Sequence, residues 1–579
     1  MRKVIQQLKQ YKKDTFLCIT MAALEVVMEI LLPFITAIII DEGLQGSNMP
    51  TIYRYGILMI VLAFFSLFFG AAAGKFAASA ASGLSANLRE SIYANIQTFS
   101  FSNIDKFSVP GLVTRMTTDI TNVQNAFMMV IRVAVRAPLN LVFSYLMCLI
   151  INVRLSLMFL IAIAFLVFVM GVIMVIAMRI FNRVFQKYDD LNASVQENIS
   201  AIRVVKAFVR EGYENTKFSK ASANLYRMFV KAEGLLAFTN PVMMVAVYFC
   251  IISLSWLGAQ FIVGGSLTTG DLTSLFSYIM SMMMSLMMLS MVIVMISMSM
   301  ASIRRIGEVL EETPDLNNPA NPVMEVSDGR IDFNGVSFSY KHGSGKNALS
   351  DIDLHINAGE TIGVIGGTGS GKSSLVNLIC RLYDVDDGAV YVGGVDVRKY
   401  DMEVLRNQVS VVLQKNTLFS GTILDNLRWG NPEATEQECI DACKAACADE
   451  FIDRMPDGYH TRIERGGANV SGGQKQRLCI ARALLKKPKV LILDDSTSAV
   501  DTATDAKIRA AFAERIPGTT KIIIAQRISS VEGADRILVL DEGRVNGFDT
   551  HENLLKTNAI YQEIYESQVK GGGDFDQPA

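Results

Sequence analysis

The chain contains the stretch Gly366-Gly367-Thr368-Gly369-Ser370-Gly371-Lys372-Ser373, which fits G-x-x-x-x-G-K-[ST], the pattern of a phosphate-binding P-loop. An apolar run typical of a strand precedes it at residues 361–365, and a helical pattern follows it at residues 374–382. The glycines allow successive backbone N–H groups to point at phosphate oxygens, and the helix N-terminus adds the positive end of its dipole. We therefore predict that this stretch and Ser374 bind a nucleotide, with Lys372 on the β- and γ-phosphates and Ser373 on Mg²⁺.

Hydrophobic residues are distributed unevenly along the chain. They make up 51% of its 579 residues, and nearly all the long apolar runs lie within residues 15–300, whereas residues 329–569 have the composition of a soluble α/β domain. The net charge of −2 argues against a surface that binds nucleic acid. We predict a transmembrane domain at 1–303, a linker at 304–328, a nucleotide-binding domain at 329–569 and a disordered tail at 570–579.

Six apolar stretches are long enough to cross a membrane. Short loops join them in pairs, and two long polar segments with helical patterns, 82–125 and 179–240, join the pairs. The long segments hold thirteen Lys and Arg residues, whereas the short loops hold only Arg54 and Arg154, so the positive-inside rule predicts that the long segments and both termini are cytoplasmic. We expect the fourth and fifth spans to continue as helices well beyond the bilayer. The six expected spans are 15–40, 56–81, 126–151, 155–178, 241–264 and 272–300.

Two spans carry unusual side chains. Glu25 and Glu29 lie on one face of the first span, where they either meet a cationic substrate or pair with Arg132 or Arg136 of another span. The sixth span is rich in methionine, whose unbranched side chains suit a promiscuous binding surface, although ordinary packing against lipid or other helices is the alternative. Its helically spaced methionines are Met280, Met284, Met287, Met291, Met295 and Met298.

The cysteines do not form the pattern of a secreted disulfide framework. Cys439, Cys443 and Cys447 are spaced four residues apart, on one face of an expected helix, and no His lies close in sequence to act as a fourth metal ligand. Because cysteine is so often buried, we predict that these three form a buried helix face and assign no metal site.

The soluble half carries five further motifs besides the P-loop. They are Tyr340 at the end of 336–340, Gln414 after a β-patterned run, Val470-Ser471-Gly472-Gly473-Gln474, the apolar strand 490–494 ending in Asp494, and Ser498-Ala499-Val500-Asp501. With the P-loop, and in this order, they resemble the nucleotide-binding domain of ATP-binding-cassette (ABC) transporters, and with the six spans the chain up to about residue 569 resembles an ABC exporter half-transporter. The implied fold is an all-α membrane domain of six helices joined to an α/β P-loop ATPase domain.

The resemblance implies a role for each motif. Tyr340 stacks on adenine, whereas Gln414 and Asp494 join Ser373 at Mg²⁺. Ser471, Gly472, Gly473 and Gln474 form the signature, usually written LSGGQ, which clamps the γ-phosphate held by the opposing domain, with Asp501 nearby in the D-loop. Two chains are therefore needed to form a pair of ATP sites, and segments near 102–110 and 208–216 transmit the closure of the ATPase domains to the membrane helices.

Two residues depart from the family pattern at the site of hydrolysis. Asp495 stands where the family has Glu as the general base, and the missing methylene retracts the carboxylate by about 1.5 Å. A misplacement of ~1 Å can lower a rate on the order of 100-fold. Gln526 stands where the family has His, and its amide can hydrogen-bond a phosphate but carries no positive charge.

This combination resembles the degenerate subunit of heterodimeric bacterial multidrug ABC exporters, because the signature stays intact while the chain's own ATP site is weakened twice. We therefore predict an ATP-driven exporter of hydrophobic or amphipathic compounds in the cytoplasmic membrane, paired with a different half-transporter whose site performs most of the hydrolysis. The alternatives are a homodimeric lipid or drug exporter that uses Asp495 as the base, and an ATP-gated channel or regulator.

Overall fold

The computed structural model describes residues 2–340, 347–495 and 502–571. Its contacts divide the chain into two compact units. The first, called the membrane unit below, comprises Met1–Gln97 and Val109–Glu312, and the second, the ATPase unit, comprises Thr98–Ser108 and Thr313–Ala579. These units differ from the predicted domain limits at two places. Residues 304–311 continue a membrane-unit helix, and residues 98–108 group with the ATPase unit because their side chains contact it.

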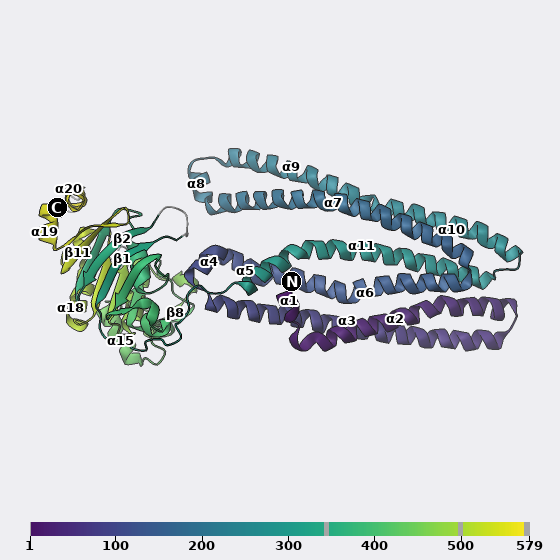
Figure 1. The fold of residues 1–579 in the computed structure, drawn as a ribbon, viewed down its shortest axis with the longest axis horizontal. Helices are drawn as coiled ribbons and strands as arrows, with labels where there is room; N and C mark the ends of the chain where they lie inside the picture. The colour runs from purple at the N-terminus through teal and green to yellow at the C-terminus, as the bar shows by residue number, and fades with distance from the viewer. Residues whose placement is uncertain (1, 341–346, 496–501, 572–579) are drawn as a thin grey trace. The chain divides into compact units, whose positions relative to one another are not determined.

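Among the described residues, six helical segments are long and apolar enough to cross a membrane, which confirms the six predicted spans. Figure 1 shows the helices of the membrane unit running alongside one another. The spanning helices are α2 (Lys12–Ile38), α3 (Met49–Thr98), α6 (Ile120–Ile151), α7 (Val153–Ser200), α10 (Thr239–Val263) and α11 (Thr269–Glu311). Shorter elements between them are α1 (Arg2–Gln6), η1 (Lys9–Tyr11), η2 (Ile39–Gln45), α5 (Val109–Thr114), η3 (Arg115–Asp119), α8 (Ile202–Ala207) and α9 (Glu211–Ala237).

The fourth span continues far beyond the bilayer, as the helical pattern predicts. Helix α7 has 48 residues and is therefore about 72 Å long, more than twice the roughly 30 Å hydrocarbon core. The short helix α8 then reverses the chain, and α9 returns alongside α7 and leads into α10 (Figure 1). At this reversal Phe208 and Val209 are exposed, in the second of the two segments that the family resemblance assigns to coupling.

An ion-pair cluster joins helices α2 and α6. The Arg136 guanidinium lies 2.6 Å from a Glu29 carboxylate oxygen and 3.4 Å from one of Glu25. Glu25 is buried, and its second carboxylate oxygen has no hydrogen-bond partner among the described residues. Of the two roles considered for these glutamates, pairing with an arginine of another span is therefore the one observed.

The methionines of α11 divide between two environments. Met282 and Met283 are buried among α2, α6 and α10, where Tyr278 also donates a hydrogen bond of 2.9 Å to the carbonyl of Ile30. Of the six methionines in the predicted stripe, five face outward in the single chain, namely Met280, Met284, Met287, Met291 and Met298, and Met295 is half-buried. The stripe is thus an exposed apolar face rather than part of the core of this unit.

The described part of the ATPase unit is built on two main sheets, with a small two-stranded sheet of β7 and β8 beside them. The larger runs in the order β12–β11–β3–β10–β9–β6, with β11, β3, β10, β9 and β6 parallel, and the smaller is antiparallel in the order β2–β1–β4–β5. Apolar side chains on both faces of the central strands form its core. The strands are β1 (Ile331–Phe338), β2 (Leu349–Ile356), β3 (Thr361–Gly366), β4 (Asp387–Val392), β5 (Val395–Asp396), β6 (Val409–Val412), β7 (Gly421–Thr422), β8 (Arg462–Ile463), β9 (Val490–Asp494), β10 (Thr520–Ile524), β11 (Arg536–Asp541) and β12 (Arg544–Asp549).

Helices cover the larger sheet and connect its strands. They are α12 (Lys372–Ile379), α13 (Met402–Gln408), α14 (Ile423–Leu427), α15 (Glu436–Ala445), α16 (Asp449–Ile452), α17 (Gly472–Leu484), α18 (Thr502–Arg515), α19 (His551–Thr557) and α20 (Ala559–Gly571), with α4 (Phe101–Phe107) contributed from the first half of the chain. Helix α20 continues two residues into the predicted tail, and residues 572–579 lie outside the described part.

All eight cysteines of the chain are described, and each is a buried free thiol. Cys439, Cys443 and Cys447 lie in the apolar core beneath α15 and α17. Burial raises the pKa of the Cys443 thiol well above its ordinary value. All three thiols are therefore buried as predicted, but α15 ends at Ala445, so Cys447 lies in the turn after the helix rather than on its face.

Candidate nucleotide-binding site

Four predicted motifs meet at one edge of the larger sheet. The P-loop follows β3, Gln526 follows β10, Asp494 ends β9, and Gln414 follows β6. These strands are parallel neighbours in the order β3–β10–β9–β6, with Val364 opposite Ile524 and Ile524 opposite Asp494. The carboxyl ends of parallel strands in such sheets form the crevice where ligands bind. Residues that are far apart in sequence are therefore collected at one site.

The P-loop has the backbone conformation that its glycines allow. Gly369 and Gly371 have φ angles of 81° and 98°, in the left-handed region that favours glycine. A Cβ atom on Gly371 would lie 2.8 Å from the carbonyl oxygen of Ala348. Gly367, Thr368 and Gly369 are exposed at the turn, whereas Ser370 is buried behind it. The loop therefore presents its backbone to the crevice, as a phosphate cradle requires.

Lys372 begins α12 and folds back over the P-loop. Its ammonium group donates hydrogen bonds to the carbonyl oxygens of Gly366 at 2.7 Å and of Gly367 at 2.8 Å. Partial burial lowers the pKa of this ammonium group, against the opposing effect of Asp494 and Asp495. The charge of Lys372 is thus held at the mouth of the loop by neutral carbonyls, which an anionic phosphate can replace.

Oxygen ligands suitable for a divalent cation lie next to the P-loop. The Ser373 hydroxyl donates a hydrogen bond of 3.3 Å to the Asp494 carboxylate, which is buried at the end of β9. Burial raises the pKa of Asp494, and the neighbouring Asp495 carboxylate raises it further. A hydroxyl and a carboxylate are the ligand types that Mg²⁺ prefers, so the residues present fit this ion, and protons compete with it for Asp494 as the pH falls.

Asp495 is held by amide groups from two other strands. Its Oδ2 accepts a hydrogen bond of 2.8 Å from the Gln526 side chain and one of 3.4 Å from the Gln414 side chain. The buried Gln476 of α17 donates to the Asp495 backbone carbonyl at 3.4 Å. Asp495 also has a positive φ of 48°, a conformation that aspartate tolerates better than most residues other than glycine. Two glutamines thus orient the carboxylate of Asp495, and a third holds its backbone.

An aromatic cluster lies beside the N-terminus of α12. The Tyr340 hydroxyl lies 3.0 Å from the Ser374 hydroxyl, and its ring meets that of Tyr383 edge-on, with centroids 5.2 Å apart at an angle of 89°. Phe338 contacts both rings, at 4.9 and 5.5 Å. The exposed face of Tyr340 is therefore supported from behind, in a position next to the phosphate cradle where a planar base can stack.

The same cluster contacts helix α4. This helix overlaps the segment near 102–110, the first of the two segments expected to couple the domains. The Tyr383 hydroxyl donates a hydrogen bond of 2.8 Å to Asp105, and the Tyr383 ring lies 6.1 Å from that of Phe101. Asp315 accepts hydrogen bonds from Ser100 and, at 2.5 Å, from Ser102. Tyr383 thus connects the ring predicted to hold adenine with α4, both within the ATPase unit.

The signature residues lie apart from this edge of the sheet. Ser471 caps α17: its hydroxyl accepts the backbone N–H of Gln474 at 3.3 Å, and the Gln474 side chain accepts the backbone N–H of Ser471 at 2.9 Å. Gly472 and Gly473 form the first turn of the helix, so backbone N–H groups at its N-terminus face outward. The remaining predicted residue, Asp501, lies outside the described residues.

Sequence reasoning did not find Gln476 or Tyr383, and it named the segment near 102–110 without singling out Asp105. Gln476 follows the signature by only two residues, and a glutamine on the apolar side of a helix was a signal that it contacts the site. Tyr383 and Asp105 are isolated residues separated by 278 positions, and neither belongs to a motif. Only the fold brings them together.

Family comparisons agree with this geometry. Residues 15–302 match the family described as "ABC transporter transmembrane region", and residues 349–498 match the family described as "ABC transporter". The chain is 36% identical over 568 residues to an "Uncharacterized ABC transporter ATP-binding protein YfiB" of Bacillus subtilis (strain 168), covering 98% of both proteins. The chain belongs to the ABC transporter family. Its membrane domain is fused to its ATPase domain, which is the exporter half-transporter arrangement, and membership implies ATP binding at the P-loop edge.

Two further similar proteins have more specific names. An "ATP-dependent lipid A-core flippase" of Desulfotalea psychrophila (strain LSv54 / DSM 12343) is 33% identical over 463 residues, covering 79% of this chain and 80% of that protein. A solved structure of a bacterial Atm1-family ABC exporter with ATP bound superimposes with a TM-score of 0.83, covering 96% of this chain and 99% of that one. The identity in that pair is 24%, so it supports the ABC exporter fold alone.

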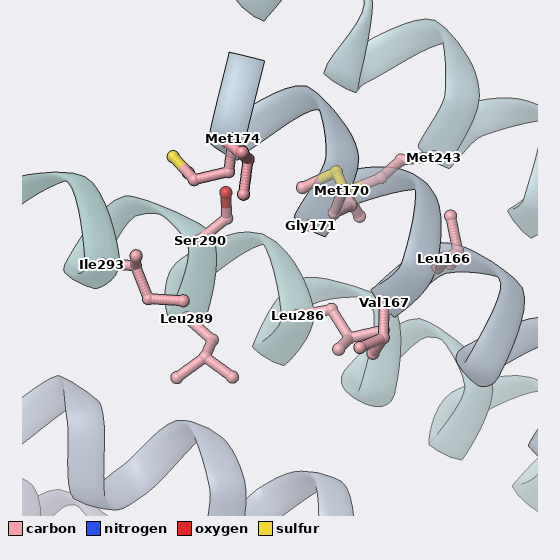
Figure 2. A pocket seen from close by; sticks show the side chains of 11 residues that line it. Leu166, Val167, Met170, Gly171, Met174, Met243, Leu286, Leu289, Ser290 and Ile293 are labelled. Atoms are coloured by element: carbon pink, nitrogen blue, oxygen red, sulfur yellow. The ribbon is translucent and has the colours of Figure 1, made fainter. Parts of the chain in front are cut away.

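The membrane unit of this ABC transporter contains an apolar cavity of about 310 Å³ between α7, α10 and α11. Figure 2 shows Met170 and Met174 on the α7 side, and Leu286 and Ser290 on the α11 side. Ser290 carries the one hydroxyl among the lining side chains, and Met243 of α10 closes a further side. An apolar wall with adaptable thioethers suits a hydrophobic ligand of variable shape.

Proposed function

We propose that this ABC exporter carries hydrophobic or amphipathic compounds out across the cytoplasmic membrane as one half of a heterodimer. In this proposal the chain's own P-loop site binds ATP but hydrolyses it slowly, and its signature completes the competent site of a different half-transporter. The Lys and Arg distribution supports a cytoplasmic position for the ATPase domain and both termini.

The observation that carries the proposal is the position of the Asp495 carboxylate. It is one methylene shorter than the glutamate usual in the family, and its Oδ2 already accepts hydrogen bonds from Gln526 and Gln414. The two amide hydrogen bonds occupy the side of Oδ2 that a general base would turn toward the attacking water, so this oxygen is not free to accept a proton from it. Gln526 itself supplies no positive charge for the transition state. Both changes lower the rate of hydrolysis at this site.

ATP and Mg²⁺ have distinct partners in the proposed site. The P-loop amides and Lys372 bind the phosphates, Tyr340 stacks on the base, and Ser373, Asp494 and Gln414 hold Mg²⁺. Mg²⁺ when bound neutralises phosphate charge and orients the phosphates. None of these groups is altered by the Asp495 and Gln526 replacements, so nucleotide binding is retained while hydrolysis is slowed.

The intact signature supports pairing with a second half-transporter. The capped N-terminus of α17 offers backbone N–H groups and the Ser471 hydroxyl to an anion from outside the chain. In a heterodimer that anion is the γ-phosphate of ATP on the partner's P-loop. The signature residues are intact although the chain's own site of hydrolysis is altered at Asp495 and Gln526. This difference favours a signature that acts on ATP bound to the partner.

The experiment compares ATP hydrolysis by this chain alone and by this chain co-expressed with the half-transporter encoded next to it. Each preparation is assayed with and without Asp495→Asn, and Lys372→Ala is included as a binding-deficient reference. The proposal expects a nearly inactive single chain, and an active pair that is almost unaffected by Asp495→Asn. Substituting the partner's catalytic glutamate should abolish activity of the pair.

A homodimeric lipid exporter is the second candidate function, favoured by the similarity to the lipid A-core flippase over 79% of this chain. It expects brisk hydrolysis by the single chain that is abolished by Asp495→Asn. Transport assays in proteoliposomes, with labelled lipid and an amphipathic dye measured in parallel, then show which of the two kinds of compound is the substrate. Brisk hydrolysis dependent on Asp495 would overturn the heterodimer proposal.

A further inference from the structure

A second cavity of about 930 Å³ continues from the apolar cavity along the same two helices. On α11 the lining passes directly from Ile293 in the first cavity to Val294 in the second. On α7 it passes from Val175 to Met178, one helical turn further on. The two cavities therefore lie end to end along α7 and α11, and the second carries nearly all the polar side chains.

The two walls of the second cavity differ in chemistry. Helices α6 and α11 contribute amides, hydroxyls and the guanidinium groups of Arg304 and Arg305. Helices α7 and α9 contribute apolar side chains, the rings of Phe181 and Phe229, and the carboxylate of Glu233. A cationic, hydrogen-bonding wall thus faces an aromatic, acidic wall.

Two of these charges have no protein partner within the described residues. Arg305 is neutralised, because its Nε donates to Asp119 at 2.8 Å and its guanidinium forms an ion pair with that buried carboxylate. Arg304 and Glu233, in contrast, form no ion pair or hydrogen bond with any residue that the structure describes. They line the same cavity from opposite walls without pairing with each other. One cation and one anion are left for a ligand.

We propose that this cavity binds the zwitterionic head group of an amphipathic substrate. The anionic group of the head lies at Arg304, with Asn122 and Ser297 as further donors, and the ammonium group lies at Glu233 beside Phe181 and Phe229. A guanidinium forms strong hydrogen bonds to a phosphate or carboxylate, and aromatic faces attract a quaternary ammonium. This inference rests on the proposed export function and narrows its substrate class.

The length of the site fits a molecule with a long alkyl chain. Arg304 follows Leu289 of the apolar cavity by fifteen residues of continuous helix, which is about 22 Å along the axis. A head group at Arg304 therefore leaves its chain between α7 and α11, beside Met174 and Leu289. A purely cationic or purely anionic amphipath of the same length would leave one of the two protein charges unmatched, which lowers its affinity.

The test uses three probes with the same chain and different head groups: hexadecylphosphocholine, hexadecyl phosphate and hexadecyltrimethylammonium. The full transporter, with its partner, is held in a non-ionic detergent, and each probe below its micellar concentration competes with radiolabelled hexadecylphosphocholine. We expect the zwitterion to bind on the order of tenfold more tightly than either singly charged probe. Competition by vesicle-borne phosphatidylethanolamine then distinguishes a bilayer lipid from a dissolved amphipath as the source of the head group.

Two variants test whether the anionic group of the head binds Arg304 and the ammonium group binds Glu233. Arg304→Gln should weaken binding of the zwitterion and the anion but leave the cation unchanged, and Glu233→Gln should weaken the zwitterion and the cation but leave the anion unchanged. Glu311→Gln on α11 and Lys231→Gln on α9 remove charges outside the cavity and should change none of the three affinities. This reciprocal pattern cannot arise from misfolding, which would lower all three.

The inference is overturned if the three probes bind equally, or if both cavity variants affect all probes alike while thermal stability is unchanged. ATP hydrolysis by the same preparations separates this outcome from failure of the proposed function. Normal hydrolysis and dye transport without head-group selectivity overturn the inference alone. Absence of hydrolysis by both the single chain and the pair overturns the proposed function, whatever the probes show.

Discussion

Asp495 is the residue on which the proposed function of this ABC transporter's own ATP site depends. The sequence shows that its side chain is short, but not that Gln526 and Gln414 both donate to the same carboxylate oxygen. That arrangement follows from the parallel order of β3, β10, β9 and β6, which brings residues from separate motifs within hydrogen-bonding distance. The motif residues could therefore be predicted from sequence, whereas the contacts that restrain Asp495 could not.

Restoring the family residues should restore hydrolysis. We expect Asp495→Glu combined with Gln526→His to raise the ATPase rate of the single chain on the order of 100-fold, because the base regains about 1.5 Å of reach and the site regains a group that can carry charge. Phosphate release by the purified chain measures the effect. The same pair of changes in a Lys372→Ala background should remain inactive, and a wild-type chain already as fast as the restored one would contradict the prediction.

At the scale of elements, the six spans and the strand that leads into the P-loop are confirmed because their patterns are local. Helix α4 is different. The family resemblance assigns the segment near 102–110 to coupling, but nothing in residues 101–107 identifies their contacts in the ATPase unit, because the partners Tyr383 and Asp315 lie more than two hundred residues away. Likewise the sequence shows a methionine stripe on α11 but not that Met282 and Met283 are buried while Met284 is exposed.

Tyr383 should influence coupling more than nucleotide binding. Tyr383→Ala removes the ring between Tyr340 and Phe101 and the hydrogen bond to Asp105, so we expect several-fold less substrate transported per ATP hydrolysed, with a smaller change in ATP affinity. Tyr383→Phe keeps the ring contacts and serves as the matched control, with an intermediate effect. Proteoliposome transport and ATPase assays on the same sample give the ratio. Equal ratios in all three proteins would show that α4 is coupled by other contacts.

The ion-pair cluster between α2 and α6 should stabilise the membrane unit. Arg136→Gln leaves Glu25 and Glu29 without their shared cation, and we expect it to lower the free energy of unfolding by about 2 kcal/mol, less than for a fully buried pair because Arg136 is partly exposed. Unfolding in a detergent titration measures the change. Adding Glu25→Gln and Glu29→Gln should recover most of the loss, whereas a further loss would indicate that the glutamates act independently of Arg136.

At the scale of the whole molecule, the chain consists of two units that each have their own core, and the path of the chain between them is not sequential. Residues 98–108 belong to the ATPase unit although both flanking segments belong to the membrane unit. Composition alone could separate an apolar half from a soluble half. Composition could not predict that residues 98–108 pack with the ATPase unit. The composition of this short segment suits the cytoplasmic part of either unit, and its assignment depends on contacts with distant residues.

The cysteines give a prediction for the intact transporter. Because all eight are buried, a membrane-impermeant maleimide should label the native chain at well under one site per molecule and the denatured chain at all eight. Intact-mass spectrometry counts the labels. A variant with cysteine at the exposed position Phe208 is the positive control and should gain one rapid label. Rapid labelling of the native wild type would mean that part of the core opens in solution.

The burial of every thiol has a practical consequence for following this ABC transporter through its cycle. Spectroscopic reporters are usually attached to single cysteines, which first requires the removal of the natural ones and the repacking of the sites that they leave. Here a cysteine introduced at a surface position can carry a spin label or fluorophore in an otherwise unmodified chain. Distances within each unit can therefore be followed during nucleotide turnover without altering the cores that hold those units together.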